Sequence, residues 1–226
     1  MKRILTFSCS LLVAWLASGC ASTALVKIKT QPTLNTAPRR IHLTVLLKEP
    51  EVIYDNGQGY DPRTYWGKDL APNPAKVFAA ALEASQGFRS VTAGSSGASL
   101  KSSVEVTLRV TTKYKMDPTH MLRAIIGGGT LFLLGPFVSN HKDSFTAVCE
   151  VDFQKKGKEL LSFKSDSKRE VINNIFTGNS QKQYSLGISA ANGDAITNVV
   201  NQVIGSLDKL EKELVQSDET SSDFGQ

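Results

Sequence analysis

A long alternation of apolar and polar residues from Ser103 to Met116 constrains the fold more than any other feature of this chain. The apolar members are Val104, Val106, Leu108, Val110, Tyr114 and Met116, and the polar members are Glu105, Thr107, Arg109, Thr111, Lys113 and Lys115. Successive side chains of a β-strand point to opposite faces of the sheet. The pattern therefore predicts a long strand with one face on a core and the other in water.

A second alternation runs from Phe145 to Phe153. The sequence Lys155-Lys156-Gly157-Lys158 after it is typical of a tight turn, and it leads into a third apolar run from Leu160 to Ser165. We expect these segments to form an antiparallel pair or meander. Cys149 shares the apolar face of the Phe145–Phe153 strand, which predicts a buried and unreactive thiol.

The remaining elements have clear local signals. Ile41–Leu47 is apolar on both faces, as in a central strand, and Phe88–Ala93 is expected to be a brief strand. Asn73 can cap a helix that begins at Pro74 and closes at Gly87. Apolar residues at helical spacing from Ile196 to Leu214 predict a long amphipathic helix with Asn192 or Asp194 near its cap.

The order strand, helix, four strands, helix predicts an α/β fold of the α+β type. We expect one domain over residues 41–215, with a largely antiparallel sheet and two main helices packed on one face. From Gln216 to Gln226 the residues are small and polar, which predicts a disordered tail.

The amino-terminus has the pattern of a signal peptide over residues 1–19. Lys2 and Arg3 precede an apolar stretch from Ile4 to Ala17, which is shorter than the ~20 residues that a membrane-spanning helix requires. Residues 20–40 are polar, contain Thr and Pro, and are expected to form a flexible tether.

The run from Leu16 to Cys20 (LASGC) resembles the lipobox of bacterial lipoproteins, although Ala17 stands where that family most often has Leu. The resemblance implies that Cys20 becomes the first mature residue and carries thioether-linked diacylglycerol, usually with an amide-linked acyl chain. Two or three acyl chains hold a protein on a bilayer far more firmly than one chain does. Ala21 stands where lipoproteins retained at the inner membrane commonly have Asp, so the resemblance implies an outer-membrane protein that faces the periplasm.

Composition and motifs argue against several classes of function. The chain has 26 basic and 21 acidic residues and a net charge of +5, and removal of Lys2 and Arg3 lowers this to +3, too little to favour nucleic acid. The three histidines His42, His120 and His141 lack the paired spacing of a zinc site. The expected mature chain contains no nucleophile elbow or zincin motif, and we expect no enzymatic activity, cofactor or metal.

An apolar segment from Ala124 to Val138 interrupts the two long strands. As a helix its 15 uncharged residues would reach about 22 Å, short of the ~30 Å hydrocarbon core, and Gly127–Gly129 argues against one continuous helix. The segment either contacts a membrane or partner, or folds into the core of the protein with the glycines as its turn. The contact residues in the first case are Ile125, Ile126, Leu131, Phe132, Leu133, Leu134 and Phe137.

A second candidate site is the stretch from Glu51 to Asn73, which the sequence predicts as a long loop. Its rings at Tyr60, Tyr65 and Trp66 can stack on a glycan or peptide. The alternative is a surface loop that its own aromatic residues hold in place.

The combination of lipobox, tether, small α/β body and apolar interruption is similar to outer-membrane lipoprotein families that serve as accessory or assembly factors. The order of elements from Ile41 to Leu214 is also similar to the CsgG and TolB N-terminal type of domain. These resemblances imply a non-enzymatic lipoprotein, anchored in the membrane by its lipid, that docks onto a protein partner in the envelope. The alternatives are a subunit of an oligomeric outer-membrane pore or secretion channel, and a glycan- or peptidoglycan-binding module.

Overall fold

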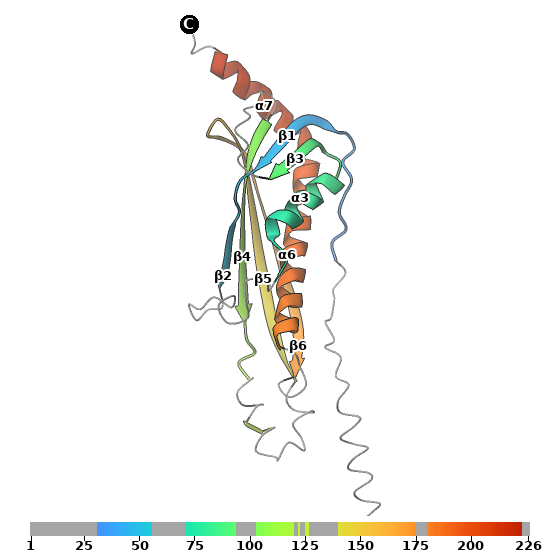
Figure 1. Ribbon diagram of the computed structural model, residues 1–226, viewed down its shortest axis with the longest axis vertical. Coiled ribbons are helices and arrows are strands. Elements are labelled where there is room, and N and C mark those ends of the chain that lie inside the picture. Colours follow the sequence, from blue (N-terminus) through green and yellow to red (C-terminus); the bar gives the residue numbers. More distant parts are fainter. Residues whose placement is uncertain are drawn as a thin grey trace, which may run out of the picture.

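The fold is a single twisted sheet with helices on one face, and it is elongated along the strands (Figure 1). The computed structural model describes residues 31–55, 71–93, 103–119, 122, 125–126, 140–174 and 180–222. Six strands occur within these ranges: β1 (Ile41–Leu47), β2 (Glu51–Asp55), β3 (Phe88–Ala93), β4 (Ser103–Lys115), β5 (Asn140–Lys155) and β6 (Lys158–Asn174). The helices described are α3 (Pro74–Ala84), α6 (Ser180–Gly205) and α7 (Leu207–Ser222).

The strand order is β3-β1-β4-β5-β6, and β2 pairs with the second half of β4 beside β1. The three longest strands, β4, β5 and β6, are antiparallel, whereas β1 is parallel to β3 and β4, and β2 is parallel to β4. The α+β prediction is confirmed, and the sheet is mixed because its amino-terminal strands add in parallel. Glu51–Asp55 forms β2 and is not part of the loop that the sequence predicts there.

The β5–β6 hairpin turns at the predicted position. Lys156 and Gly157 both have positive φ, and they connect the paired residues Lys155 and Lys158. Two central residues with positive φ match the right-handed twist of the strands, so the turn can support a long hairpin. β5 and β6 extend to 16 and 17 residues, well beyond the ranges that the alternation indicates.

Helix α3 begins as the sequence predicts. The Asn73 side chain accepts a hydrogen bond from the Ala75 amide at 2.9 Å, and Pro74 occupies the first turn, where no amide hydrogen is needed. Phe78 and Leu82 are buried on the face toward the sheet. The helix ends before Gln86, which has a positive φ of 59°.

Helix α6 differs from the prediction at its amino-terminus. It begins at Ser180, so Asn192 and Asp194 are interior residues and neither caps the helix. Both side chains are buried against the sheet, where Thr112 Oγ1 donates to Asn192 Oδ1 at 2.6 Å and Asp194 pairs with Arg169. The predicted single helix is divided at Ser206, and α7 continues beyond it.

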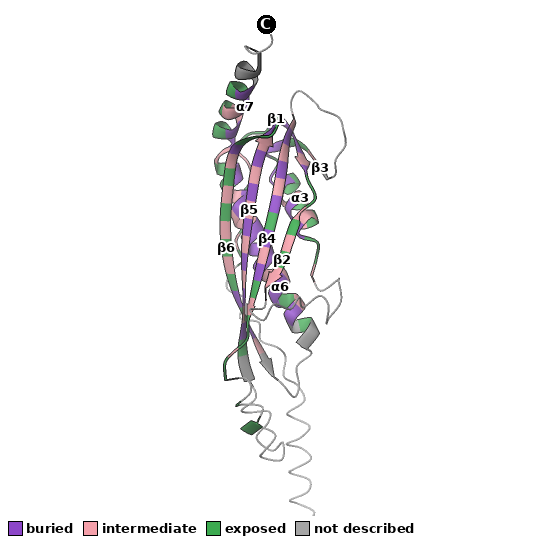
Figure 2. Ribbon diagram, turned by 90° about the vertical axis from the view of Figure 1, so that its left-hand side faces the viewer, coloured by how far each residue is buried: buried purple, intermediate pink, exposed green. Residues whose placement is uncertain are grey.

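The core lies between one sheet face and the helices (Figure 2), and the core members among the described residues lie between Leu34 and Leu214. α7 remains helical to Ser222, although the composition from Gln216 onward predicts disorder. Ser217 is buried one turn after Leu214, which extends the packed side of α7 into this polar segment.

Candidate functional site

Residues 31–40, here called the strap, dock along the helices although the sequence predicts a flexible tether there. The side chain of Asn201 on α6 accepts from the Asn35 amide at 2.8 Å and donates to the Thr33 carbonyl at 2.9 Å. The Ala37 amide donates to the Ser85 carbonyl at 2.8 Å. These bonds fix the end of the predicted tether to the folded body.

The strap ends in an arginine that binds α7. Arg39 Nη2 lies 2.6 Å from Asp208 Oδ1 and 2.6 Å from Glu211 Oε2. The hydrogen bonds that Arg39 donates to Asp208 and Glu211 raise the pKa of Arg39. Thr33 contacts Asn201 and Arg39 contacts Asp208, so the strap runs in the same direction as α6 and α7, as Figure 1 shows. Its amino-terminal end therefore points toward the beginning of α6.

The beginning of α6 lies at the end of the molecule where β4 stops and β5 starts. Most of the exposed large hydrophobic residues among those described lie at this end, which we call the apolar end. Five of the seven lie on the segment after β4 or on the second turn of α6: Met116 (41% exposed), Leu122 (59%), Ile125 (67%), Ile126 (43%) and Leu186 (44%). Val215, 54% exposed, lies on α7 at the opposite end. Scattered exposed hydrophobic residues are normal, but a group at one end indicates an interaction site.

Exposed lysines surround the apolar end. Lys113 and Lys115 close β4, Lys142 opens β5, and Lys182 lies in the first turn of α6. Amphipathic surfaces with apolar residues and lysines side by side suit the interface of a bilayer with anionic headgroups.

A cluster of three rings, of which Phe145 and Tyr184 are buried and Tyr114 is half-buried, supports the apolar end from within. The Tyr114, Phe145 and Tyr184 rings have centroids 4.8 to 5.6 Å apart, and the two tyrosine hydroxyls are hydrogen-bonded to each other. Burial, followed by the bond to Tyr184, raises the pKa of Tyr114, so its hydroxyl stays protonated at neutral pH. The cluster joins β4, β5 and α6 directly beneath the exposed residues.

A buried ion pair joins the middle of α6 to β6, farther from the apolar end than the three rings. The Arg169 guanidinium pairs with Asp194, which also accepts from Ser167 Oγ at 3.2 Å, and both charged side chains are less than a tenth exposed. A buried charge is tolerated when its partner and hydrogen bonds are in place. These polar groups are paired with one another in the interior, an arrangement that holds a helix on a sheet.

The sheet face away from the helices is not covered by any described element, and it carries a charge ladder across four strands: Glu51, Arg109, Glu150 and Lys164. Arg109 lies 2.6 Å from Glu51 and 3.7 Å from Glu150, and Lys164 lies 2.6 Å from Glu150. The hydrogen bond to Glu51 raises the pKa of Arg109. The hydrogen bond from Lys164 and the nearby positive charges lower the pKa of Glu150, against the opposite effect of burial.

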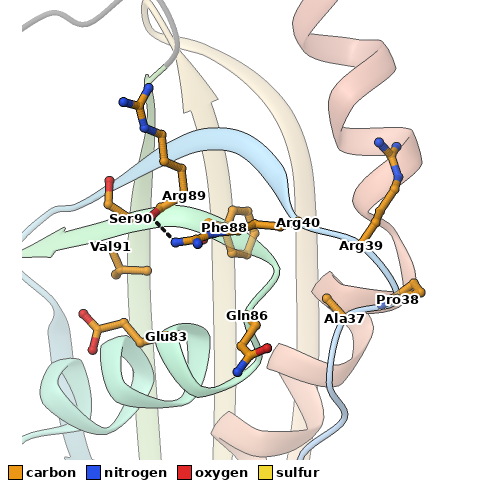
Figure 3. A pocket seen from close by; sticks show the side chains of 10 residues that line it. All are labelled: Ala37, Pro38, Arg39, Arg40, Glu83, Gln86, Phe88, Arg89, Ser90 and Val91. Carbon is orange, nitrogen blue, oxygen red and sulfur yellow. Dashed lines mark hydrogen bonds between the residues drawn. The ribbon is translucent and has the colours of Figure 1, made fainter.

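A cleft of about 720 Å³ opens beside β3, where the strap meets the end of α3 (Figure 3). Arg40 crosses it and donates to the carbonyls of Phe88 at 2.9 Å and Arg89 at 2.6 Å, while Arg39 is held by α7. Two of its three arginines are therefore engaged within the protein. This cleft was not predicted from the sequence, although two consecutive arginines, Arg39 and Arg40, directly precede the predicted strand Ile41–Leu47. Its lining residues are Ala37, Pro38, Arg39, Arg40, Glu83, Gln86, Phe88, Arg89, Ser90 and Val91.

Of the residues predicted to form a membrane or partner contact, Ile125 and Ile126 are described, and both are exposed. Leu131, Phe132, Leu133, Leu134 and Phe137 lie outside the described residues, as do Cys20 and the candidate ligand residues Tyr60, Tyr65 and Trp66. Met116, which the alternation predicts on the core face of a strand, follows the end of β4 and is exposed, and Leu122 and Leu186 were not predicted as contact residues. Only the fold brings them to the same end.

Two further properties of the described residues bear on function. No three of their His, Cys, Asp and Glu side chains gather as a metal site would require. None of their helices combines the length and apolar character needed to cross a bilayer.

No known family model matches this sequence, and no curated protein matches it. Among solved structures, the chain is similar to a Helicobacter pylori protein described as a neuraminyllactose-binding hemagglutinin homolog, at 11% identity over 83% of this chain and 96% of that one, with a TM-score of 0.49. It is also similar to a Xanthomonas campestris protein of the DUF330 family, at 13% identity over 80% of this chain and 96% of that one, with a TM-score of 0.39.

Proposed function

We propose that this protein is a lipid-anchored protein of the bacterial cell envelope that docks, without catalysing a reaction, onto another envelope component through its apolar end. The observation that carries the proposal is the direction of the strap. The strap leads from the body toward the same end of the molecule that exposes Leu122, Ile125 and Ile126. An anchor upstream of the strap and the apolar end can therefore meet one membrane.

The lengths agree with this arrangement. Along α6, the distance from Asn201 to Tyr184 is about 26 Å at 1.5 Å per residue. The chain from Cys20 to Thr33 can span at most about 43 Å when extended. An acylated Cys20 can thus reach the level of the apolar end and beyond it. A membrane-bound protein of this design holds its apolar end at the bilayer surface or against a partner embedded there.

A binding role fits the chemistry of the described side chains better than catalysis does. Arg169 pairs with Asp194, and Thr112 with the Asn192 oxygen, across the helix–sheet interface. Among the described residues, only the Asn192 amide nitrogen is a buried side-chain polar atom without a hydrogen-bond partner. Catalytic groups are instead usually found in a cleft with perturbed pKa values. Docking to an envelope component as an accessory or assembly factor is the form of this role that we favour.

Anchoring is tested by the variant Cys20→Ser. We expect the wild-type protein to fractionate with outer membranes and to yield an amino-terminal peptide whose mass carries the acyl chains on Cys20. The variant should lack the acyl mass and the processing that depends on it. An unacylated Cys20 in the wild-type protein would contradict the proposal.

Docking is tested by placing a photo-crosslinking amino acid at position 125 in cells. The matched control places it at position 215, which is similarly exposed but lies at the opposite end. We expect a discrete lipid or protein adduct from position 125 and none from position 215. Equal adducts from both positions, or none from position 125, would count against a docking role for the apolar end.

A further inference from the structure

The outer edge of β6 is a long unpaired strand edge. β6 spans 17 residues and borders the sheet, and no strand in the described part of the chain pairs with its far side (Figure 2). The other border is formed by β3 and β2, which are both much shorter, and Arg40 binds carbonyl groups at the start of β3. Open edges favour pairing with another strand, and proteins usually shorten or cover them.

The backbone groups that face this edge can be identified. In an antiparallel ladder, every second residue points its amide and carbonyl away from the partner strand. The Lys164 carbonyl accepts a hydrogen bond from Gln202 Nε2 at 3.2 Å, and Gln202 lies on a helix and not on β5. Lys164 therefore belongs to the residues whose amide and carbonyl point away from β5, here called the outward set. The same alternation assigns Ser162, Asp166, Lys168 and Glu170 to it. Their side chains all lie on the uncovered face of the sheet and are exposed.

The outward residues alternate in charge: Lys164, Asp166, Lys168 and Glu170. If a second copy of β6 pairs antiparallel about a two-fold axis at Ser167, Asp166 faces Lys168 and Lys164 faces Glu170. The symmetry doubles these pairs, so four opposite-charge pairs form. All of these residues point their backbone groups at the edge, as pairing requires.

Neighbouring registers lose this complementarity. A two-fold axis at Asp166 places Asp166 opposite itself and Lys164 opposite Lys168. An axis at Lys168 places Lys168 opposite itself and Asp166 opposite Glu170. An axis at Ser165 retains only the Lys164–Asp166 pairs. Like charges directly opposite each other on adjacent strands are destabilising, so the charge pattern selects the axis at Ser167.

We propose that the protein forms a symmetric dimer in which β6 of one copy pairs antiparallel with β6 of a second copy about Ser167. The two sheets become one continuous sheet, with the helices of both copies on one face and the ion pairs on the other. Such an interface uses the same surface on both subunits, as a two-fold axis requires. The inference goes beyond the proposed envelope role and does not depend on acylation.

The test is analytical ultracentrifugation of the chain from residue 21 onward, which retains all of the core residues that the structure describes. We expect a reversible dimer. Lys168→Asp places like charges opposite Asp166 in both symmetric positions and should weaken dimerisation about tenfold or more. The double variant Asp166→Lys/Lys168→Asp exchanges the charges within the same register and should restore the affinity to within about threefold.

The control Lys76→Asp makes the same charge change at an exposed position on α3 and should leave the dimer unchanged. A monomeric wild-type protein at high concentration would overturn the proposal. So would a dimer that Lys168→Asp does not weaken, or one that the double variant fails to restore.

Cysteine substitution tests the register. Residues at a two-fold axis in a non-hydrogen-bonded position have Cα atoms about 4.5 Å apart, within the range of a disulfide. Ser167→Cys should therefore form a covalent dimer under mild oxidation, whereas Ser165→Cys should not. Cross-linking through position 165 and not 167 would overturn the register, and no cross-link through position 167 would overturn the interface.

Discussion

At the scale of single residues, close packing between α6 and β5 depends on Gly187. A Cβ atom on this glycine would lie 2.4 Å from the ring of Phe145, which is itself held by the two tyrosines of the aromatic cluster. Contacts that short force a movement of the ring or the helix.

We expect Gly187→Ala to lower the free energy of unfolding by about 1–3 kcal/mol, because the strain exceeds the gain in helix propensity. Gly193→Ala on the same helix is the matched control, since its added Cβ would meet nothing within 4 Å. That variant should raise the free energy of unfolding by about 0.5–1 kcal/mol. Urea denaturation measures both, and equal effects would contradict the packing argument.

Cys149 illustrates what a sequence pattern can predict at this scale. The alternation of its strand predicts burial, and the structure confirms it. Burial, with a smaller contribution from Glu150, raises the pKa of Cys149 to about 12, so the thiolate is scarce at neutral pH.

We expect native protein to resist iodoacetamide at pH 8 and to react only after denaturation. Mass spectrometry of the intact protein after a timed exposure measures the extent of labelling. Labelling of the folded protein at the rate of a free thiol would show that β5 opens or that the thiol is accessible.

At the scale of elements, α3 and every described strand except β2 could be predicted because their periodicity and caps are local, whereas β2 was predicted as part of a loop. Helix α6 could not be located fully, because its first half contains Gly187, Asn192, Gly193 and Asp194 in place of a continuous apolar stripe. These residues suit a helix only when a sheet supplies a close-packed ring and polar partners. That information lies in β4, β5 and β6, far away in the sequence.

The uncovered sheet face provides an element-scale prediction about pH. Glu150 has a lowered pKa in the folded protein, so its contribution to stability is present above the ordinary value of 4.5 and is lost as the pH falls through the lowered value. We expect Glu150→Gln to reduce the free energy of unfolding by about 0.5–1 kcal/mol at pH 7 and by almost nothing at pH 3.

Thermal unfolding followed by circular dichroism between pH 3 and 7 measures this difference. Lys164→Met removes the first cause of the shift and should reproduce much of the pH dependence of Glu150→Gln. A difference between wild type and Glu150→Gln that stayed constant over this range would show that the carboxylate is not stabilised in the folded state.

At the scale of the whole molecule, the α+β class could be predicted because it requires only the types and order of elements. The candidate site could be predicted only in part. Ile125 and Ile126 were found because they stand in an apolar run, whereas the strap was missed because Thr33, Asn35 and Arg39 have no local pattern. Their partners lie more than 160 residues away.

The strap itself can be tested by truncation. We expect a chain that begins at residue 41 to be less stable than one that begins at residue 31 by about 2–4 kcal/mol, mainly from the loss of the hydrogen bonds at Thr33, Asn35 and Ala37 and of apolar contacts at Leu34 and Ala37, with the exposed bonds of Arg39 and Arg40 lost as well. Asn201→Ala should destabilise the longer chain and leave the shorter one almost unchanged. The same cost in both chains would show that Asn201 stabilises the body without the strap.

The strap also has a consequence for the order of events during folding. Asn201, Asp208 and Glu211 belong to the last elements of the chain, so the strap closes the longest loops in the molecule, and such contacts form late. A chain exported amino-terminus first leaves residues 31–40 undocked until α6 and α7 have followed. If Cys20 is acylated as we propose, the link between it and the body is longest during export, and it shortens by the length of the strap once the protein has folded.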